Sequence, residues 1–228
     1  MPLPFRQPTL RGAAKGNRRV SLSPRNLLLL LVLALTPLRA GALEFALTEQ
    51  QGAHVLTLRG EIARDDAGRV ERLLRLSAPV VAVRFDSTGG NLTEAFAIGR
   101  LLRRQRVAAR VPDGAVCASA CVYAFAGARD RQVGPEGRIG VHMYASTHGG
   151  DVLAMIAQLV REHGQEGAAI VARRLEQRSA AMTLEVAAYL EEMAIPLSLL
   201  IPTFATPPDR VHWLSRDELR AFRLTGAR

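Results

Sequence analysis

Short apolar runs separated by glycine-containing turns recur along most of the chain. Several of them alternate between apolar and polar side chains or are rich in β-branched residues, the two patterns typical of strands. The predicted strands cover residues 43–48, 55–59, 80–85, 107–111, 132–133, 138–142 and 211–214. The segment Ser87–Gly90 is expected to end the third of them.

Between these strands, apolar residues recur at helical spacing. The predicted helices cover residues 65–76, 92–104, 118–126, 151–178, 184–193, 196–204 and 216–222. Asn91 can cap the second helix, with Glu94 as its capping-box partner. Gly164 and Gly167 interrupt the helix predicted over residues 151–178. Strands and helices therefore alternate without long loops, which predicts a single α/β domain over residues 43–228 with a mainly parallel sheet.

The first 42 residues differ from the rest of the chain. They contain seven of the 30 Lys and Arg residues and none of the 21 Asp and Glu residues. An uninterrupted apolar run covers residues 27–35, and Ala40-Gly41-Ala42 follows as a small-residue cleavage site. A basic segment, a short apolar core and a small-residue site in this order predict a signal peptide over residues 1–42. An uncleaved membrane anchor is the alternative.

Charge and cysteine content narrow the function classes. The formal net charge of +9 is carried mostly by the first 42 residues, the predicted leader. The pairs Arg103-Arg104 and Arg173-Arg174 are too sparse for a nucleic-acid surface, so no nucleic-acid partner is expected. No His/Cys cluster has metal-ligand spacing, so no metal is expected. Cys117 and Cys121 lie four positions apart at the start of the helix predicted over residues 118–126, and a bridge at this spacing within one helix is awkward. We therefore expect two small buried thiols, with a disulfide as the alternative because an exported protein permits one.

Three segments carry candidate chemistry. Ser119 lies at the start of a predicted buried helix, where backbone amides are unpaired. Gly89-Gly90 follows a buried strand, and glycine lets a substrate approach the backbone closely. His142 ends a short strand and could act as a general base for the Ser119 hydroxyl. Because strand ends gather at one edge of a parallel sheet, we expect an acyl-transfer site in which the amides of Gly90 and Ala120 hold an oxyanion.

Each of these segments also has a purely structural explanation. Serine is a common helix N-cap, and a Gly-Gly pair can form an ordinary strand-to-helix turn. A histidine at a strand end is often structural, and His148 is a rival candidate for the base. A phosphate-binding loop is disfavoured, because the chain has neither a Gly-Lys-Ser/Thr ending nor a GxGxxG motif at this turn.

The segments Phe85–Asn91, Cys117–Cys121 and Ile139–His142 together resemble the proteolytic subunit of Clp protease and its relatives in the ClpP/crotonase superfamily, most closely the exported bacterial ClpP-like proteins. The resemblance extends over about residues 43–224. It implies a spiral of ββα units and assembly into a homo-oligomer. It also implies the roles of nucleophile for Ser119, base for His142 and oxyanion amides for Gly90 and Ala120.

The resemblance further implies an aspartate shortly before a C-terminal strand. An ungapped match places Val211 at that position. Asp209, two residues earlier, is the nearest carboxylate and our candidate for the third catalytic residue, and Asp151 is a second candidate. A Ser-His dyad without an acid is still able to react, because the acid mainly fixes the tautomer and orientation of the base.

The expected function is that of an exported serine hydrolase, a peptidase that acts on peptides or proteins without a cofactor. Its expected location is the periplasm, or the membrane facing the periplasm if the leader is retained. Two alternatives stay open. One is a catalytically silent binding or assembly module with the same fold. The other is a crotonase-type acyl-CoA enzyme, which an export signal disfavours because CoA is cytosolic.

Overall fold

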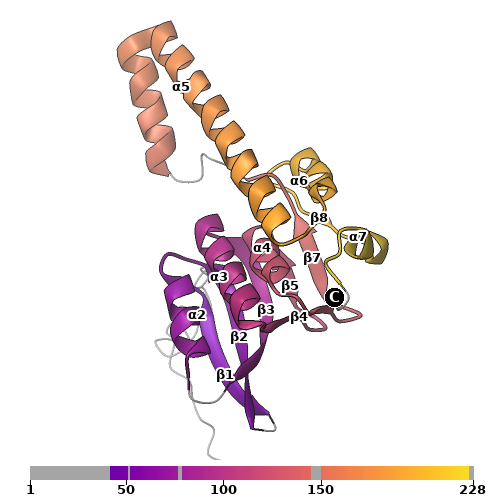
Figure 1. Ribbon diagram of the computed structural model, residues 1–228. Helices are drawn as coiled ribbons and strands as arrows, with labels where there is room; N and C mark the ends of the chain where they lie inside the picture. The colour runs from indigo at the N-terminus through magenta and orange to yellow at the C-terminus, as the bar shows by residue number, and fades with distance from the viewer. Residues whose placement is uncertain (1–41, 51, 77–78, 145–149, 226–228) are drawn as a thin grey trace, which may run out of the picture. The chain divides into compact units, whose positions relative to one another are not determined.

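The computed structural model describes residues 42–50, 52–76, 79–144 and 150–225. These residues form a mixed α/β structure built on one sheet (Figure 1). The predicted α/β class with its mainly parallel sheet is therefore confirmed. Apart from Ala42, the expected signal peptide lies outside the described residues. None of the helices in the described ranges is long and apolar enough to cross a membrane.

The sheet branches at its central strand, β3. The strands are β1 (Glu44–Gln50), β2 (Ala53–Ile62), β3 (Val80–Gly90), β4 (Ala108–Val111), β5 (Val116–Ala118), β6 (Arg131–Val133), β7 (Arg138–Val141) and β8 (His212–Trp213). The first half of β3 pairs with β4, which pairs with β6. The end of β3 pairs with β5 through Ser87 and Cys117, and β5 pairs with β7. The carboxyl ends of β3, β5 and β7 therefore lie at one edge.

One predicted boundary is wrong in an informative way. β3 does not end at Ser87 but continues to Gly90, because Gly89 and Gly90 pair with Glu61 and Ile62 of β2. The two glycines adopt φ values of 112° and 122°, so the strand bends while it stays hydrogen-bonded to its neighbour. The glycine pair is thus part of the sheet edge and not a free loop.

The helices are α2 (Asp66–Leu74), α3 (Leu92–Gln105), α4 (Ala120–Gly127), α5 (Gly150–Glu192), the 3₁₀ helix η1 (Leu197–Leu199), α6 (Leu200–Ala205) and α7 (Arg216–Ala221). In α5, two helical arms meet at a kink at Gly164 (Figure 1). The predicted break between residues 178 and 184 is absent. The intervening residues include Ala and Met and no Gly or Pro, so nothing there ends a helix.

Capping at the start of α3 follows the prediction in part. The Asn91 side chain accepts a hydrogen bond from the Glu94 amide at 3.1 Å. The Glu94 carboxylate does not return to Asn91 but accepts from the Ala67 amide at 2.9 Å. This side chain therefore ties α2 to α3. A complete capping box occurs instead at α7, between Ser215 and Glu218.

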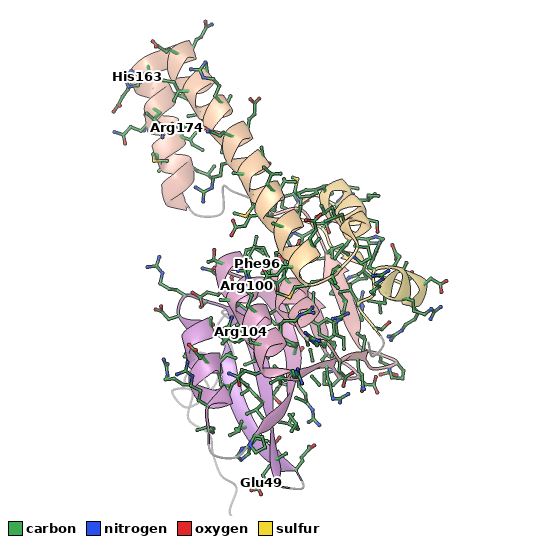
Figure 2. The ribbon with its side chains drawn as sticks, in the orientation of Figure 1. Glu49, Phe96, Arg100, Arg104, His163 and Arg174 are labelled. Carbon is green, nitrogen blue, oxygen red and sulfur yellow. A yellow bond between two sulfur atoms is a disulfide. The ribbon has the colours of Figure 1, made fainter. Side chains whose placement is uncertain are left out.

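An aromatic cluster anchors the end of α5 on α3 and α4. Tyr189 stacks on Phe96 with ring centroids 4.3 Å apart, and its hydroxyl donates to the Tyr123 carbonyl at 2.7 Å. Burial raises the pKa of Tyr189. Arg100 lies near Phe96 at the rim of the cluster (Figure 2). Arg100 forms an ion pair with Glu192 at 2.8 Å. The last turns of α5 are thus fixed to the helices that carry the candidate site.

Two arginines hold the carboxyl end of α4. Arg103 donates to the Gly127 carbonyl at 2.9 Å. Arg131 is almost fully buried and donates to the carbonyls of Ala126 and Ala128. Cations are favourable at this end of a helix, where carbonyls are unpaired and the dipole is negative. The position of α4, and hence of the turn at its amino end, is therefore strongly determined.

Candidate functional site

Ser119 occupies a strained turn between β5 and α4. Its backbone has φ 54° and ψ −127°, and its side chain makes no capping hydrogen bond. A non-glycine residue in this region costs about 1–3 kcal/mol, and such strain persists only where the surroundings hold it. A serine on a sharp, strained strand-to-helix turn is typical of nucleophiles in hydrolases. Ser119 is therefore not an ordinary helix N-cap, because its hydroxyl makes no hydrogen bond to the backbone amides of α4.

The backbone of the turn is held on two sides. The Ser119 amide donates to the Gly140 carbonyl of β7 at 2.9 Å, and its carbonyl accepts from the Val122 amide at 3.0 Å. Ala120 is the first helical residue, so its amide has no acceptor within the helix. This amide lies beside the Ser119 side chain at the positive end of α4, which favours negative charge.

The prediction of two free thiols is wrong. Cys117 and Cys121 form a disulfide with a Cα–Cα distance of 5.3 Å. The prediction failed because Cys117 lies in β5 and only Cys121 lies in α4. Because the sharp turn at Ser119 separates the two cysteines, they are not positions four apart on one helix, and their Cα–Cα distance lies within the usual range for a disulfide.

Gly89 packs directly against the Ser119 turn. A Cβ added to Gly89 would lie 2.6 Å from the Ser119 Cβ and 3.0 Å from the Ala120 amide nitrogen. Gly90 lies against β2 instead, where a Cβ would meet the Ile62 carbonyl at 2.2 Å. The structure thus brings Gly89 into contact with the Ser119 turn, whereas Gly90 contacts β2. Glycine is required at both positions by crowding as well as by φ.

Ser87 supports this arrangement and was not predicted to do so. It is buried, and its hydroxyl accepts a hydrogen bond from the Gly89 amide at 3.2 Å. A serine hydroxyl that accepts from an amide two residues later is a common local turn. The Ser-x-Gly spacing in the sequence was the available signal for this role.

His142 directly follows β7, the strand that pairs with β5. In that pairing Ala118 lies opposite Gly140, so Ser119 and His142 leave neighbouring parallel strands at the same edge. The imidazole Nδ1 lies 2.8 Å from the Met143 carbonyl oxygen. Because a carbonyl can only accept, Nδ1 donates this hydrogen bond, and in the neutral imidazole Nε2 is then the nitrogen with the lone pair. The Met143 carbonyl thereby fixes the tautomer that a general base needs, a role that no side-chain pattern could predict.

The predicted acid is not brought to the base. Asp209 is exposed on the turn Pro207–Arg210, and within the described ranges no hydrogen bond or ion pair joins it to His142. Val141 lies opposite His212 in the β7–β8 pairing, and one further residue along this register places Val211 opposite His142. The position that the resemblance assigns to the acid therefore holds an apolar side chain. His148 and the Asp151 side chain lie outside what the structure describes.

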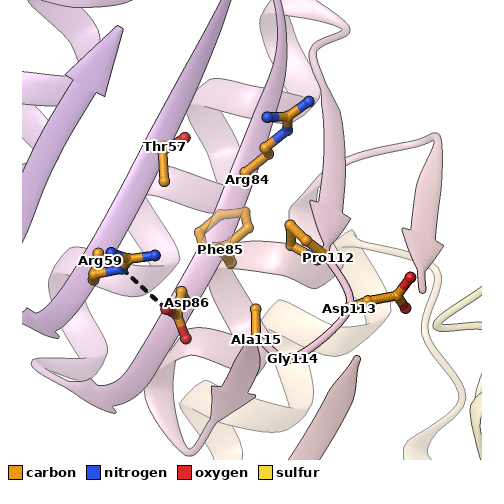
Figure 3. Close-up of a pocket in the computed structure, with 9 residues that line it drawn as sticks. All are labelled: Thr57, Arg59, Arg84, Phe85, Asp86, Pro112, Asp113, Gly114 and Ala115. Carbon is orange, nitrogen blue, oxygen red and sulfur yellow. Dashed lines mark hydrogen bonds and ion pairs between the residues drawn. The ribbon is translucent and has the colours of Figure 1, made fainter. Parts of the chain in front are cut away.

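A pocket of about 350 Å³ lies away from these residues, on β2, β3 and the turn after β4 (Figure 3). Arg59 and Asp86 form an ion pair at 3.0 Å in its wall. The second Asp86 oxygen accepts from the Val116 amide at 3.2 Å and so fixes the start of β5. None of the predicted site residues lines this pocket, so the candidate site is the strand edge around Ser119. No group of three His, Cys, Asp or Glu side chains suited to a metal occurs within the described residues.

Comparison with solved structures finds a mutant of ClpP1 from Listeria monocytogenes. The two chains share 17% sequence identity and superpose with a TM-score of 0.45, over 75% of this chain and 88% of that chain. No protein-family model matches the sequence, and no curated protein matches it either. The chemistry of the site therefore rests on its own geometry.

Proposed function

We propose that this protein is an exported serine hydrolase, and specifically a peptidase, with Ser119 as its nucleophile and His142 as its base. The observation that carries the proposal is the left-handed backbone of Ser119 on the β5–α4 turn. Ser119 is half-buried, its side chain makes no capping hydrogen bond, and its Cβ lies against Gly89 beside the Ala120 amide. Strain of this kind is concentrated at sites where it serves a function.

In the proposed reaction, a peptide carbonyl lies over the Ser119 Oγ. Nε2 of His142 takes the hydroxyl proton as Oγ attacks, and later gives it to the leaving amine. The amides of Gly90 and Ala120 hold the oxyanion, and each donor contributes about 3 kcal/mol in a well-formed site. The Met143 carbonyl holds Nδ1 in place of a carboxylate. Because a carbonyl bears no full charge, it stabilises the imidazolium less than an aspartate, and we expect a slow enzyme.

A fluorophosphonate probe tests the nucleophile. The full chain is treated with the probe, and the modified residue is identified by mass spectrometry. Labelling should occur at Ser119 and disappear in Ser119→Ala. The matched control is Ser198→Ala, since Ser198 is an exposed serine on η1, and it should label like the native protein. Equal labelling of the native chain and Ser119→Ala would remove Ser119 from the mechanism.

A silent binding module is the second candidate. The observation that favours it is that, within the described ranges, no hydrogen bond joins Ser119 to His142 and no carboxylate contacts His142. Catalytic hydrogen bonds are often long before substrate binds, so a peptidase is compatible with the same geometry. Complete absence of labelling in a folded native protein would favour the binding module.

We propose export and self-association on separate grounds. The Cys117–Cys121 disulfide supports an oxidising compartment, in agreement with the expected leader. Leu153, Met155 and Leu184 expose more than half of their surface on α5. We propose that these exposed apolar side chains contact a second copy of the chain in a homo-oligomer. Light scattering of the native chain and of Leu184→Glu would test this, and a monomeric native protein would contradict it.

A further inference from the structure

The Cys117–Cys121 disulfide spans the proposed nucleophile symmetrically. Cys117 lies two residues before Ser119, in β5, and Cys121 lies two residues after it, in the first turn of α4. Both cysteines are fully buried. The bridge therefore closes a ring of five residues with Ser119 at its centre and only alanines between Ser119 and each cysteine.

A bridge over so short a segment adds little to the stability of the whole fold. The stabilisation expected from restricting the unfolded chain grows with the length of the closed loop, and a five-residue loop is close to the minimum. The sheet, and not the disulfide, connects this segment to distant parts of the chain, since Cys117 pairs with Ser87 of β3 and Ile139 of β7. The effect of this disulfide should therefore be local.

The local need is evident at Ser119. Its backbone is in the left-handed region, and its side chain gives no hydrogen bond to stabilise the turn. Two backbone hydrogen bonds, to Gly140 and from Val122, are its other restraints. Without the bridge, rotation toward ordinary helical or extended dihedrals would relieve the strain and move the Ser119 side chain away from its contact with Gly89.

We propose that the Cys117–Cys121 disulfide positions the nucleophile, holding Ser119 in the strained conformation from which it can react. This inference rests on the proposed hydrolase function for its catalytic consequence, although the restraint itself is a property of the fold. Because both cysteines are buried, the bridge acts as a permanent part of the site in an oxidising compartment. The two cysteines are positioning residues and do not touch the substrate.

The test compares the full-length native protein with Cys117→Ala/Cys121→Ala, which removes the bridge without leaving a thiol. The second-order rate of fluorophosphonate labelling at Ser119 should fall at least tenfold. The control is Val186→Ala, a cavity variant at a fully buried position on α5. It should lose thermal stability while its labelling rate stays within twofold of native. An equal loss of labelling in both variants would mean that the disulfide only stabilises the fold in general, and would overturn the proposal.

Amide hydrogen exchange gives a readout that does not depend on activity. The Ser119 and Val122 amides are both hydrogen-bonded in the turn, and the Leu219 amide is hydrogen-bonded in α7. Loss of the bridge should speed exchange at Ser119 and Val122 at least tenfold and leave Leu219 unchanged. Unchanged exchange at all three would overturn the proposed restraint. If the native protein is not labelled at all, the hydrolase proposal fails, and exchange still decides whether the disulfide holds the turn.

If the double variant does not fold, the native protein is reduced with a water-soluble phosphine under folding conditions. The phosphine is oxidised to its oxide with an oxygen atom from water, and the disulfide gains two electrons and two protons to give two thiols. Mass spectrometry after alkylation counts the reduced molecules. Labelling at Ser119 should fall in proportion to the reduced fraction, and full labelling of reduced, folded protein would refute the inference.

Discussion

Replacing Gly89 with alanine tests the contact on which the candidate site depends. The added Cβ would lie 2.6 Å from the Ser119 Cβ, whereas ordinary contact begins at 3.4 Å. One of the two segments must therefore move by roughly 0.8 Å, close to the 1 Å displacement that typically costs about 100-fold in rate. We expect Gly89→Ala to slow fluorophosphonate labelling of Ser119 by about 100-fold.

The stability cost has two parts. Gly89 has φ 112°, and a side chain in such a conformation costs about 1–3 kcal/mol. Forcing a methyl group into a filled space costs about 1–3 kcal/mol more. For a protein of this size, each kcal/mol lowers the Tm by about 2–4 °C. Thermal unfolding followed by circular dichroism measures the sum.

Gly114→Ala is the matched control. Gly114 also has a positive φ, of 74°, but a Cβ there would meet nothing within 4 Å. Gly114→Ala should lose only the stability that the unfavourable backbone conformation costs, and its Ser119 should be labelled at the native rate. If Gly89→Ala and Gly114→Ala lose the same stability and both label at the native rate, then Gly89 does not control the position of Ser119, and the geometric argument for the site is wrong.

Three further predictions concern charge and protonation. Peptide hydrolysis should rise with pH as the general base loses its proton, and a rate unchanged in His142→Ala would exclude this base. Val211→Asp should place a carboxylate opposite His142, increase the labelling rate and move the midpoint of the pH profile upward; Val211→Asn is its control, and an equal gain in both would contradict an electrostatic effect. The Ser215 amide and then the His212 side chain hold the pKa of Glu218 below its usual range. This stabilisation is present above the unfolded-state pKa and is lost as pH falls through the folded-state value. Glu218→Gln should therefore be less stable than native at pH 7 and match it in strong acid, as measured by urea unfolding.

Local patterns predicted most of the elements correctly because each is specified by nearby residues. The alternation in β1 and β2, the cap at Asn91 and the Pro112–Gly114 turn all formed as expected. Two of the errors fall where a distant partner decides. β3 was extended by its pairing with β2, and Glu94 was drawn to the Ala67 amide.

Some features of the candidate site could be predicted from the sequence, and others depend on the tertiary structure. Ser119, Gly89 and His142 could be selected from the sequence because small residues and strand-end positions are local signals. The Met143 carbonyl at Nδ1 of His142 could not, because a backbone atom leaves no mark on the residue pattern. Asp209 was selected by its distance along the chain, whereas the strand register places Val211 opposite His142.

The sequence by itself determined the α/β class, most of the strands and helices, and the small residues around Ser119, because short-range periodicity and side-chain size act within a few residues. Only the tertiary structure decided the backbone of Ser119, its contact with Gly89 and the disulfide between Cys117 and Cys121. These features require β5 to be fixed between β3 and β7 while α4 is fixed by residues far along the chain. A strained turn of this kind exists only when the surrounding fold holds both of its ends.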